Sequence, residues 1–216
     1  MVNVLTLQPS ILNQFIAEIR DVEIQKDSMR FRWNLERIGF AFAYEICRGL
    51  AYEMKEVNTP LGTANVPVLK EYPVLATILR AGLPFHQGFL NVFDKSENAF
   101  ISAYREHLKD GTFTINIEYS SVPEIDGKIL ILGDTMLATG SSMVYAYREI
   151  LSKGKPRHTH IVSIVASMEG LEYVKRHLPQ QDITFWVGVI DEELTAQSYI
   201  VPGLGDAGDL AFGKKR

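Results

Sequence analysis

The sequence predicts an α/β protein whose mostly parallel central sheet is flanked by helices. Short apolar runs, typical of buried strands, alternate with segments of helical periodicity at short intervals. Charged residues directly follow several of these runs, at the place where open α/β sheets make their ligand contacts. The 216 residues suffice for one full core. We therefore expect a single domain over 1–216, with N-terminal helices over 1–50, a core over 51–190 and a C-terminal loop segment over 191–216.

Composition excludes several classes of protein. The hydrophobic share of 46% and the charged share of 22% are typical of a soluble globular chain. The net charge of −4 argues against a broad basic face for nucleic acid. One cysteine, Cys47, permits neither an internal disulfide nor a thiolate metal cluster, and we expect it to pack in the core. With no apolar stretch of about 18 residues and no signal-peptide pattern, we expect a cytoplasmic protein without membrane contact.

Helical periodicity marks the first fifty residues. Apolar residues recur on one face over 11–20 and again over 28–50. The second segment also carries several aromatic residues, which we interpret as core positions or as contacts with a second subunit rather than as a cofactor site. These aromatic residues are Phe31, Trp33, Phe40, Phe42 and Tyr44.

Two predicted strands are each followed by an arginine. Val74–Leu79 is a buried run ending at Arg80, and we expect a helix to begin at Pro84. A further strand, over 99–104, is closed by Arg105. These ends suggest convergent positive charge at one edge of the sheet, where the planar guanidinium of Arg80 could bind a diphosphate. The alternative is a surface arginine that merely caps a strand.

A hairpin is predicted beyond Arg105. Asp110-Gly111 is a hairpin-turn signal, and the alternation over 112–119 indicates a strand with one exposed face. Such a hairpin, projecting beside the site, could fold over a bound substrate. Earlier in the chain, residues 56–62 combine a short extended piece with a Pro/Gly turn.

The stretch over 128–142 is the strongest candidate for a ligand site. Ile129–Leu132 is a buried strand that Gly133 ends, and Asp134 places a carboxylate at its carboxyl end. Small residues over 139–142 lead into a helix over 141–153, whose free N–H groups and dipole favour a phosphate. The carboxylate would instead accept hydrogen bonds from sugar hydroxyls. The pattern matches neither the dinucleotide fingerprint nor the P-loop. An ordinary strand-to-helix turn with a serine cap is the alternative.

The C-terminal third continues the alternation and ends in a glycine-rich segment. Strands are expected over 160–166 and 183–190, and Ser167 should cap the intervening helix. Within Tyr199–Gly213, three glycines and a proline fall inside nine residues and argue against regular helix or strand, while the apolar residues of the segment argue for an ordered loop. Because glycines let the backbone approach a ligand closely, this loop suits main-chain recognition of a flat heterocycle.

Five motifs resemble those of one family. Asp134-Thr-Met-Leu-Ala-Thr-Gly140 resembles the ribose-phosphate loop of the type I phosphoribosyltransferases, in the version found in uracil phosphoribosyltransferases. Tyr199-Ile-Val-Pro-Gly-Leu-Gly-Asp-Ala-Gly-Asp209 closely resembles the uracil-binding loop of the latter family. The motifs come in the family's order and at about its spacing, over residues 50–213. The other three are Asn58-Thr-Pro-Leu-Gly62, Ile78-Leu-Arg-Ala-Gly-Leu83 and Tyr104-Arg105.

The resemblance implies a fold and a reaction. The fold would be that of type I phosphoribosyltransferases, with a small hood formed by the N- and C-terminal segments and a projecting β-hairpin. Uracil and 5-phosphoribosyl 1-diphosphate would give UMP and diphosphate through an oxocarbenium-like transition state. Mg²⁺ would be bound mainly through the substrate diphosphate and water, with no metal site made of protein side chains alone. The family also implies a homodimer or higher homo-oligomer and a possible GTP effector.

The resemblance also implies roles for particular residues. Asp134, Arg105 and Asp206 would be catalytic, and the main chain of the C-terminal loop would read the uracil edge. The residues expected to bind 5-phosphoribosyl diphosphate are Arg80, Arg105, Asp134, Thr135, Met136, Leu137, Ala138, Thr139, Gly140, Ser141, Ser142 and Asp206. Those expected to bind uracil are Ile200, Gly205, Asp206 and Ala207.

Three departures from the family pattern accompany these motifs. Thr135 stands where the family usually has proline, and Ser141 stands where a glycine normally follows the Thr-Gly pair. Residues 106–109 also differ from the family's usual acidic and threonine-bearing stretch. The alternative function is a catalytically weak, nucleotide-sensing regulator on the same fold. Purine or orotate transfer is a further alternative. The resemblance of Tyr199–Asp209, called the base loop below, to the uracil-binding loop disfavours it.

Overall fold

A seven-stranded sheet forms the centre of the computed structural model. The structure describes residues 1–107, 113–179 and 181–214. Within these ranges, residues 103–107 and 113–117 are described by their backbone alone. The strand order is β1-β9-β8-β7-β4-β5-β6. Every neighbouring pair is parallel except β5 and β6. The expected mostly parallel sheet is therefore confirmed. The strands are β1 (Val2–Val4), β4 (Val74–Leu79), β5 (Asn98–His107), β6 (Phe113–Ser121), β7 (Ile129–Leu137), β8 (His158–Ser167) and β9 (Ile183–Asp191).

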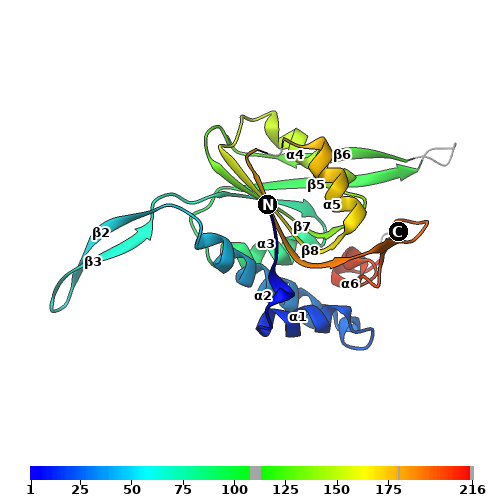
Figure 1. Ribbon diagram of the computed structural model, residues 1–216, viewed down its shortest axis with the longest axis horizontal. Coiled ribbons are helices and arrows are strands. Elements are labelled where there is room, and N and C mark those ends of the chain that lie inside the picture. Colours follow the sequence, from blue (N-terminus) through cyan, green and yellow to red (C-terminus); the bar gives the residue numbers. More distant parts are fainter. Residues whose placement is uncertain (108–112, 180, 215–216) are drawn as a thin grey trace.

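Helices cover both faces of this sheet (Figure 1). On one face lie α1 (Ile11–Arg20), α2 (Ser28–Cys47) and α3 (Gly82–Leu90), and on the other α4 (Ser141–Leu151) and α5 (Met168–His177). Side chains of β7 alternate between the two cores: Ile131 packs with the first group, and Leu130 and Leu132 with the second. Short 3₁₀ helices, η1 (Leu5–Leu7) and η2 (Ile24–Lys26), flank α1.

The aromatic residues of α2 divide between its two faces. Phe31 and Phe42 are buried in the core, whereas Trp33, Phe40 and Tyr44 are each about half exposed. Cys47, at the end of the helix, is partly buried against the same core. The exposed aromatic residues lie seven and four positions apart and so share one side of α2. Helix α2 therefore presents an aromatic face that the described residues of this chain do not cover.

Two hairpins follow from segments that the sequence marked as extended pieces with turns. Residues 56–62, expected to be a short extended piece with a turn, belong to a projecting hairpin of two eight-residue strands, β2 (Tyr52–Thr59) and β3 (Gly62–Leu69) (Figure 1). The hairpin predicted beyond Arg105 is confirmed as the antiparallel pair β5–β6, which forms one edge of the central sheet. Its predicted turn, Asp110-Gly111, lies outside the described residues.

Three further element boundaries correct the predictions. Strand β7 does not end at Gly133, because its pairing with β8 continues as far as Leu137. Helix α3 begins at Gly82, two residues before Pro84. The C-terminal loop contains β11 (Ile200–Val201), paired with β10 (Glu193–Leu194), and the short helix α6 (Ala207–Phe212). The prediction of an ordered segment is correct, but its exclusion of helix and strand is wrong.

Candidate active site

The candidate site lies where β4 and β7 end. These two strands are parallel neighbours, with Thr77 opposite Gly133, so their carboxyl ends share one edge of the sheet. Asp134 directly follows Gly133, and Arg80 directly follows β4. Because a parallel sheet gathers its strand ends in this way, two motifs more than fifty residues apart in sequence meet. The structure therefore brings Arg80 and Asp134 to the edge that the sequence predicted.

The pKa of the Asp134 carboxyl group is raised. Its side chain is half-buried, and loss of water contact raises its pKa from 3.8 to about 7. Hydrogen bonds from the backbone N–H groups of Met136 and Thr135, and from the Thr135 side chain, act in the opposite direction but are outweighed. The carboxyl group is therefore close to its titration midpoint at neutral pH when no ligand is bound.

The loop after β7 forms a left-handed turn into α4. Gly140 is the N-cap, with φ at 78°, and no side chain caps the helix from that position. The alternative of an ordinary turn included a serine cap, but Gly140 takes that position: Ser141 is already the first helical residue, and its N–H donates to the Thr139 hydroxyl over 3.4 Å. Glycine is needed at 140 because the turn has positive φ and because a Cβ would lie 2.7 Å from the carbonyl oxygen of Gly170.

The start of helix α5 packs against the loop over 138–142. The Ser167 hydroxyl donates to the carbonyl oxygen of Ala138 over 2.5 Å and accepts from the Gly170 N–H over 2.8 Å. The second bond confirms Ser167 as the cap of α5. A Cβ on Gly170 would lie 2.3 Å from the Ala138 oxygen, so this close approach requires glycine. The sequence alone does not indicate this contact, because nothing in the periodicity of α5 shows which loop its first turn contacts.

The remaining residues of the predicted phosphate motif divide into strand and loop. Thr135 and Leu137 are buried strand residues, and Met136 packs partly buried against the core. Their side chains therefore serve the fold, and a ligand at this edge would meet the loop over 138–142. Ser142 lies in the first turn of α4 and is partly exposed.

Arg80 connects the sheet to the C-terminal segment. Its Nη2 donates to Oδ1 of Asp209 over 2.8 Å, and its Nη1 donates to the Gly213 carbonyl oxygen over 3.0 Å. The arginine is 30% exposed and so remains open to a ligand. The alternative interpretation was a surface arginine that merely caps a strand. Arg80 does more than that, because it binds Asp209 of α6 and the Gly213 carbonyl oxygen that follows the helix.

The glycine-rich segment folds into a compact turn beside Arg80. Ile200 and Ala207 are buried, which fixes both ends of the turn, while Gly205 has φ at 90° and open space around its Cβ position. The Asp206 side chain accepts from the Asp209 N–H and caps α6. This cap explains why a helix forms in a glycine-rich sequence. Main-chain groups near Gly205 are thus accessible on an otherwise anchored loop.

Arg105 occupies a position in β5 opposite Ile115 of β6. Its side chain lies outside what the structure describes, so its predicted convergence with Arg80 stays a prediction. Within the described ranges, no three histidine, cysteine, aspartate or glutamate side chains group as a metal site would require. Across those same ranges no helix is both long and apolar enough to span a membrane.

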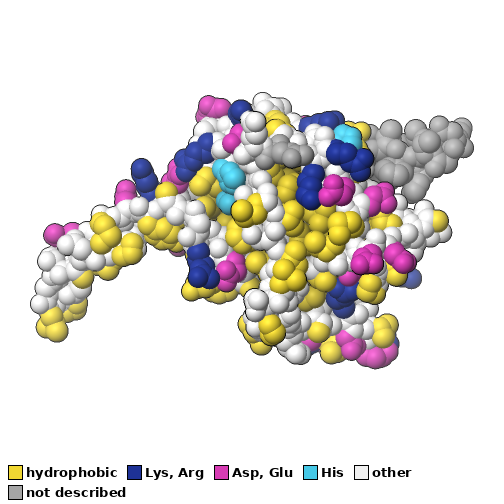
Figure 2. Space-filling view, in the orientation of Figure 1, with side chains coloured by type: hydrophobic (Ala, Val, Ile, Leu, Met, Phe, Trp, Pro, Cys, Tyr) yellow, Lys and Arg dark blue, Asp and Glu magenta, His cyan; other side chains and the backbone are white. Residues whose placement is uncertain are grey.

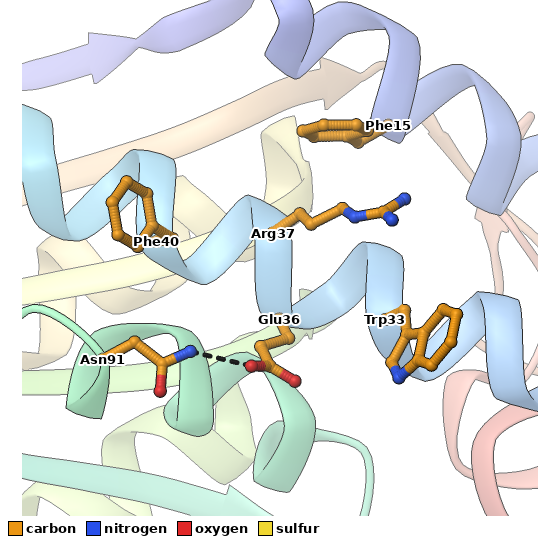
Figure 3. A pocket seen from close by; sticks show the side chains of 6 residues that line it. All are labelled: Phe15, Trp33, Glu36, Arg37, Phe40 and Asn91. Carbon is orange, nitrogen blue, oxygen red and sulfur yellow. Dashed lines mark hydrogen bonds between the residues drawn. The ribbon is translucent and has the colours of Figure 1, made fainter.

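A cavity of about 440 Å³ lies away from these residues (Figure 3). It opens over the exposed face of α2, between α1 and the end of α3, and none of the predicted site residues lines it. Figure 3 shows Arg37 extending from α2 beneath the Phe15 ring, with its guanidinium carbon 5.4 Å from the ring centre. The lining residues are Phe15, Trp33, Glu36, Arg37, Phe40 and Asn91.

Solved structures share this fold. A protein from Aquifex aeolicus superimposes with a TM-score of 0.86 at 32% identity, covering 99% of this chain and 98% of that one. A hypoxanthine phosphoribosyltransferase from Staphylococcus aureus has a TM-score of 0.51 at 12% identity over 87% and 84% of the two chains, which shows the fold alone. The sheet and the helices on its two faces are those of the phosphoribosyltransferase fold.

The family model described as uracil phosphoribosyltransferase matches residues 6–214, so the chain belongs to that family. These enzymes are pentosyltransferases, which form UMP from uracil and 5-phosphoribosyl 1-diphosphate. A relative of that name from Porphyromonas gingivalis is 53% identical over 95% of both chains. Another, from Methanothermobacter thermautotrophicus, is 40% identical over 87% of this chain and 86% of its own. The alternative of a nucleotide-sensing regulator is not favoured.

Proposed function

We propose that this reaction takes place at the edge formed by β4, β7 and the C-terminal loop, with the diphosphate subsite and the base subsite side by side. The bond from Arg80 to Asp209 is the observation that carries this arrangement. One guanidinium touches the segment expected to bind uracil and stands at the strand end expected to bind diphosphate. A substrate whose C1 lies between the two would therefore be close to its partner base, and such orientation can contribute about 7–11 kcal/mol.

In the proposed mechanism the bond from C1 to the diphosphate oxygen breaks while N1 of uracil bonds to C1. The departing diphosphate keeps the electron pair, and uracil loses its N1 proton late, to water or to the departing diphosphate, without a dedicated base. Arg80 and Arg105 stabilise the charge that develops on the diphosphate. Asp134, once ionised, accepts hydrogen bonds from the ribose hydroxyls and lies near the developing positive charge. The first turn of α4 and the loop over 138–142 hold the 5-phosphate.

The base subsite uses main-chain groups. We propose that Ile200, Gly205 and Ala207 present N–H and C=O groups to the edge of uracil. The open space at Gly205 supports this role, and the burial of Ile200 and Ala207 gives the loop the rigidity that recognition needs. Asp206 would face 5-phosphoribosyl diphosphate from the rim of the same loop.

Mg²⁺ is proposed as the metal of this site. Carboxylate oxygens are the donors that Mg²⁺ prefers, and Asp206, which we propose faces 5-phosphoribosyl diphosphate, would contact the ion through a bound water. Since Mg²⁺ usually binds through one or two carboxylates, substrate phosphates and water, a protein-only cage is not required. When bound, the ion would neutralise charge on the leaving diphosphate. Activity that persists at full rate after chelation of divalent ions would contradict this role.

Arg80 provides the direct test of the diphosphate subsite. Calorimetric binding of 5-phosphoribosyl diphosphate should weaken about 10- to 100-fold in Arg80→Ala, because a charge-assisted hydrogen bond is worth about 1.5–3 kcal/mol. Arg48→Ala is the matched control, since Arg48 is exposed at the C-cap of α2 and pairs only with Glu45 among the described residues. Equal affinities for the two variants would place the diphosphate elsewhere.

A homodimer is proposed from two exposed surfaces. The aromatic face of α2 carries Trp33, Phe40 and Tyr44, and the hairpin β2–β3 projects from the body with exposed apolar side chains, Met54 and Leu61 among them (Figure 2). A two-stranded hairpin is marginally stable alone, so contact with a second copy would stabilise it. Light scattering after size-exclusion chromatography should give twice the chain mass. A monomer at micromolar concentration would contradict the proposal.

Two further properties rest on the family resemblance. We propose a cytoplasmic location, and we propose GTP as an effector that raises turnover. Initial rates with and without GTP at subsaturating uracil test the second. No change in rate or in KM up to millimolar GTP would overturn it.

A further inference from the structure

We propose that Asp191 is a positioning residue for base recognition: its buried carboxylate fixes the turn of the C-terminal loop and ties that turn to the end of α1. This inference rests on the proposed role of Ile200, Gly205 and Ala207 in binding uracil. It adds a determinant of uracil affinity outside the loop itself. It also gives the N-terminal helix a part in substrate selection.

Asp191 contacts the C-terminal loop through its side chain. Asp191 is the last residue of β9 and is 6% exposed. Its Oδ2 accepts the backbone N–H of Gly203 over 2.9 Å. Gly203 has φ at 54°, and a Cβ there would lie 2.1 Å from the Ile200 carbonyl oxygen. The turn is therefore so tight that a shift of Gly203 must also move Ile200, a proposed uracil contact.

Asp191 also contacts the end of α1. Nη2 of Arg20, the last residue of that helix, lies 3.0 Å from Oδ2 and 3.1 Å from Oδ1 of Asp191. The carboxylate thus accepts from a guanidinium and from the loop backbone at once. Removing either partner of a buried charged pair is far more disruptive than losing a surface pair, because the remaining group stays desolvated. The end of α1 and the base loop are therefore held through one side chain.

The two ends of the base loop have separate anchors. Asp191 holds the Gly203 end, where β10 and β11 pair through Leu194 and Ile200. Helix α6, at the other end, is held by Arg80 through Asp209 and by a bond from Arg32 to the Ala211 carbonyl oxygen over 2.7 Å. Loss of Asp191 should therefore release the Ile200 side of the base subsite while leaving the side that faces Arg80 in place.

This separation predicts a specific kinetic signature. Main-chain recognition depends on N–H and C=O groups held within a few tenths of an ångström, and a misplacement of about 1 Å can reduce turnover by about 100-fold. In Asp191→Ala we expect KM for uracil to rise about 10- to 100-fold, with KM for 5-phosphoribosyl diphosphate nearly unchanged. Discrimination between uracil and cytosine should fall in the same variant.

Glu18→Ala is the matched control. Glu18 is also a carboxylate of low exposure, at 8%, and it also joins α1 to an arginine, accepting from Arg30 and from Asn34. It makes no contact with the base loop among the described residues. Both alanine variants should lower the unfolding temperature, but only Asp191→Ala should alter KM for uracil selectively. Asp191→Asn, which keeps an oxygen acceptor for Gly203, should restore part of the affinity.

Several outcomes would overturn the inference. A folded Asp191→Ala with unchanged KM for uracil would do so, as would parallel changes in both KM values for Asp191→Ala and Glu18→Ala. If Asp191→Ala does not fold, Arg20→Gln supplies the same test from the partly exposed side of the pair. Gly203→Ala distorts the turn directly: if it too leaves KM for uracil unchanged, the assignment of uracil to this loop is wrong, and not merely the role of Asp191.

Discussion

Replacing Asp134 with asparagine should stabilise the protein while impairing its chemistry. The pKa of Asp134 is about 7 in the native protein, against an ordinary value of 3.8. This difference of about three units corresponds to about 4 kcal/mol, at 1.36 kcal/mol per unit. Because part of the side chain stays open to water, the measured effect should lie below that limit, at about 1–3 kcal/mol.

The sign of the pH dependence follows from proton linkage. The native pKa lies above the unfolded one, so the native state holds the proton more tightly and is favoured at low pH. Wild-type stability should therefore fall as pH rises from about 4 to about 7, and the penalty should be complete above pH 7. Asparagine does not ionise, so Asp134→Asn should gain on the wild type across that window.

Urea unfolding of both proteins at pH 5, 7 and 8.5 measures this difference. The advantage of Asp134→Asn should grow between pH 5 and 8.5, and its kcat/KM should fall about 100-fold or more because a neutral amide cannot offset the developing cation. In the wild type, kcat/KM should rise with pH through about 7, and the variant should lack that limb. An unchanging stability difference, or a wild type that is the more stable at pH 8.5, would refute the reasoning.

Three other predictions follow from the same contacts. Gly170→Ala should raise KM for 5-phosphoribosyl diphosphate, because the added Cβ would displace Ala138. Gly49→Ala is the control, since a Cβ there would lie 3.6 Å from the nearest atom, the Ile46 carbonyl oxygen. Equal KM values for the two variants in steady-state kinetics would contradict the prediction. Ser167→Ala removes both the cap of α5 and the donor to Ala138. The free energy of unfolding, measured in urea, should fall by about 1 kcal/mol, and an unchanged value would contradict this. Glu18→Gln should be less stable than the wild type at pH 7, because bonds from Arg30 and Asn34 lower the pKa of Glu18 to about 2. The gap should shrink as pH falls from 4.5 toward 2, and a gap at pH 2.5 as large as that at pH 7 would contradict this.

Much of the fold could be predicted because it depends on local patterns. Strand β4 and helix α1 were predicted with the bounds that the structure has, since burial and periodicity repeat within each segment. The edge that gathers Arg80 and Asp134 followed from the geometry of parallel sheets. The prediction that β7 ends at Gly133 was wrong, because pairing with β8 sustains a strand through a glycine that a local pattern treats as a break.

Contacts between distant residues could not be predicted. Arg80 and Asp209 lie 129 positions apart, and Arg20 and Asp191 lie 171 apart. Neither pair leaves a periodic signal, because each arginine is also compatible with an exposed helix or strand end. Helix α6 was missed for a related reason: its formation depends on one side-chain cap, from Asp206, in a glycine-rich segment. The roles assigned to the site residues, Arg105 among them, stay predictions.

The most direct test of the function is a chromatographic assay for nucleotide products. The protein would be incubated with 5-phosphoribosyl 1-diphosphate, Mg²⁺ and either uracil, cytosine, orotate or hypoxanthine, with Asp134→Asn in parallel. We predict UMP and diphosphate from uracil alone, and a strongly reduced rate in the variant. No product with any base, from protein that binds 5-phosphoribosyl diphosphate in calorimetry, would contradict the account.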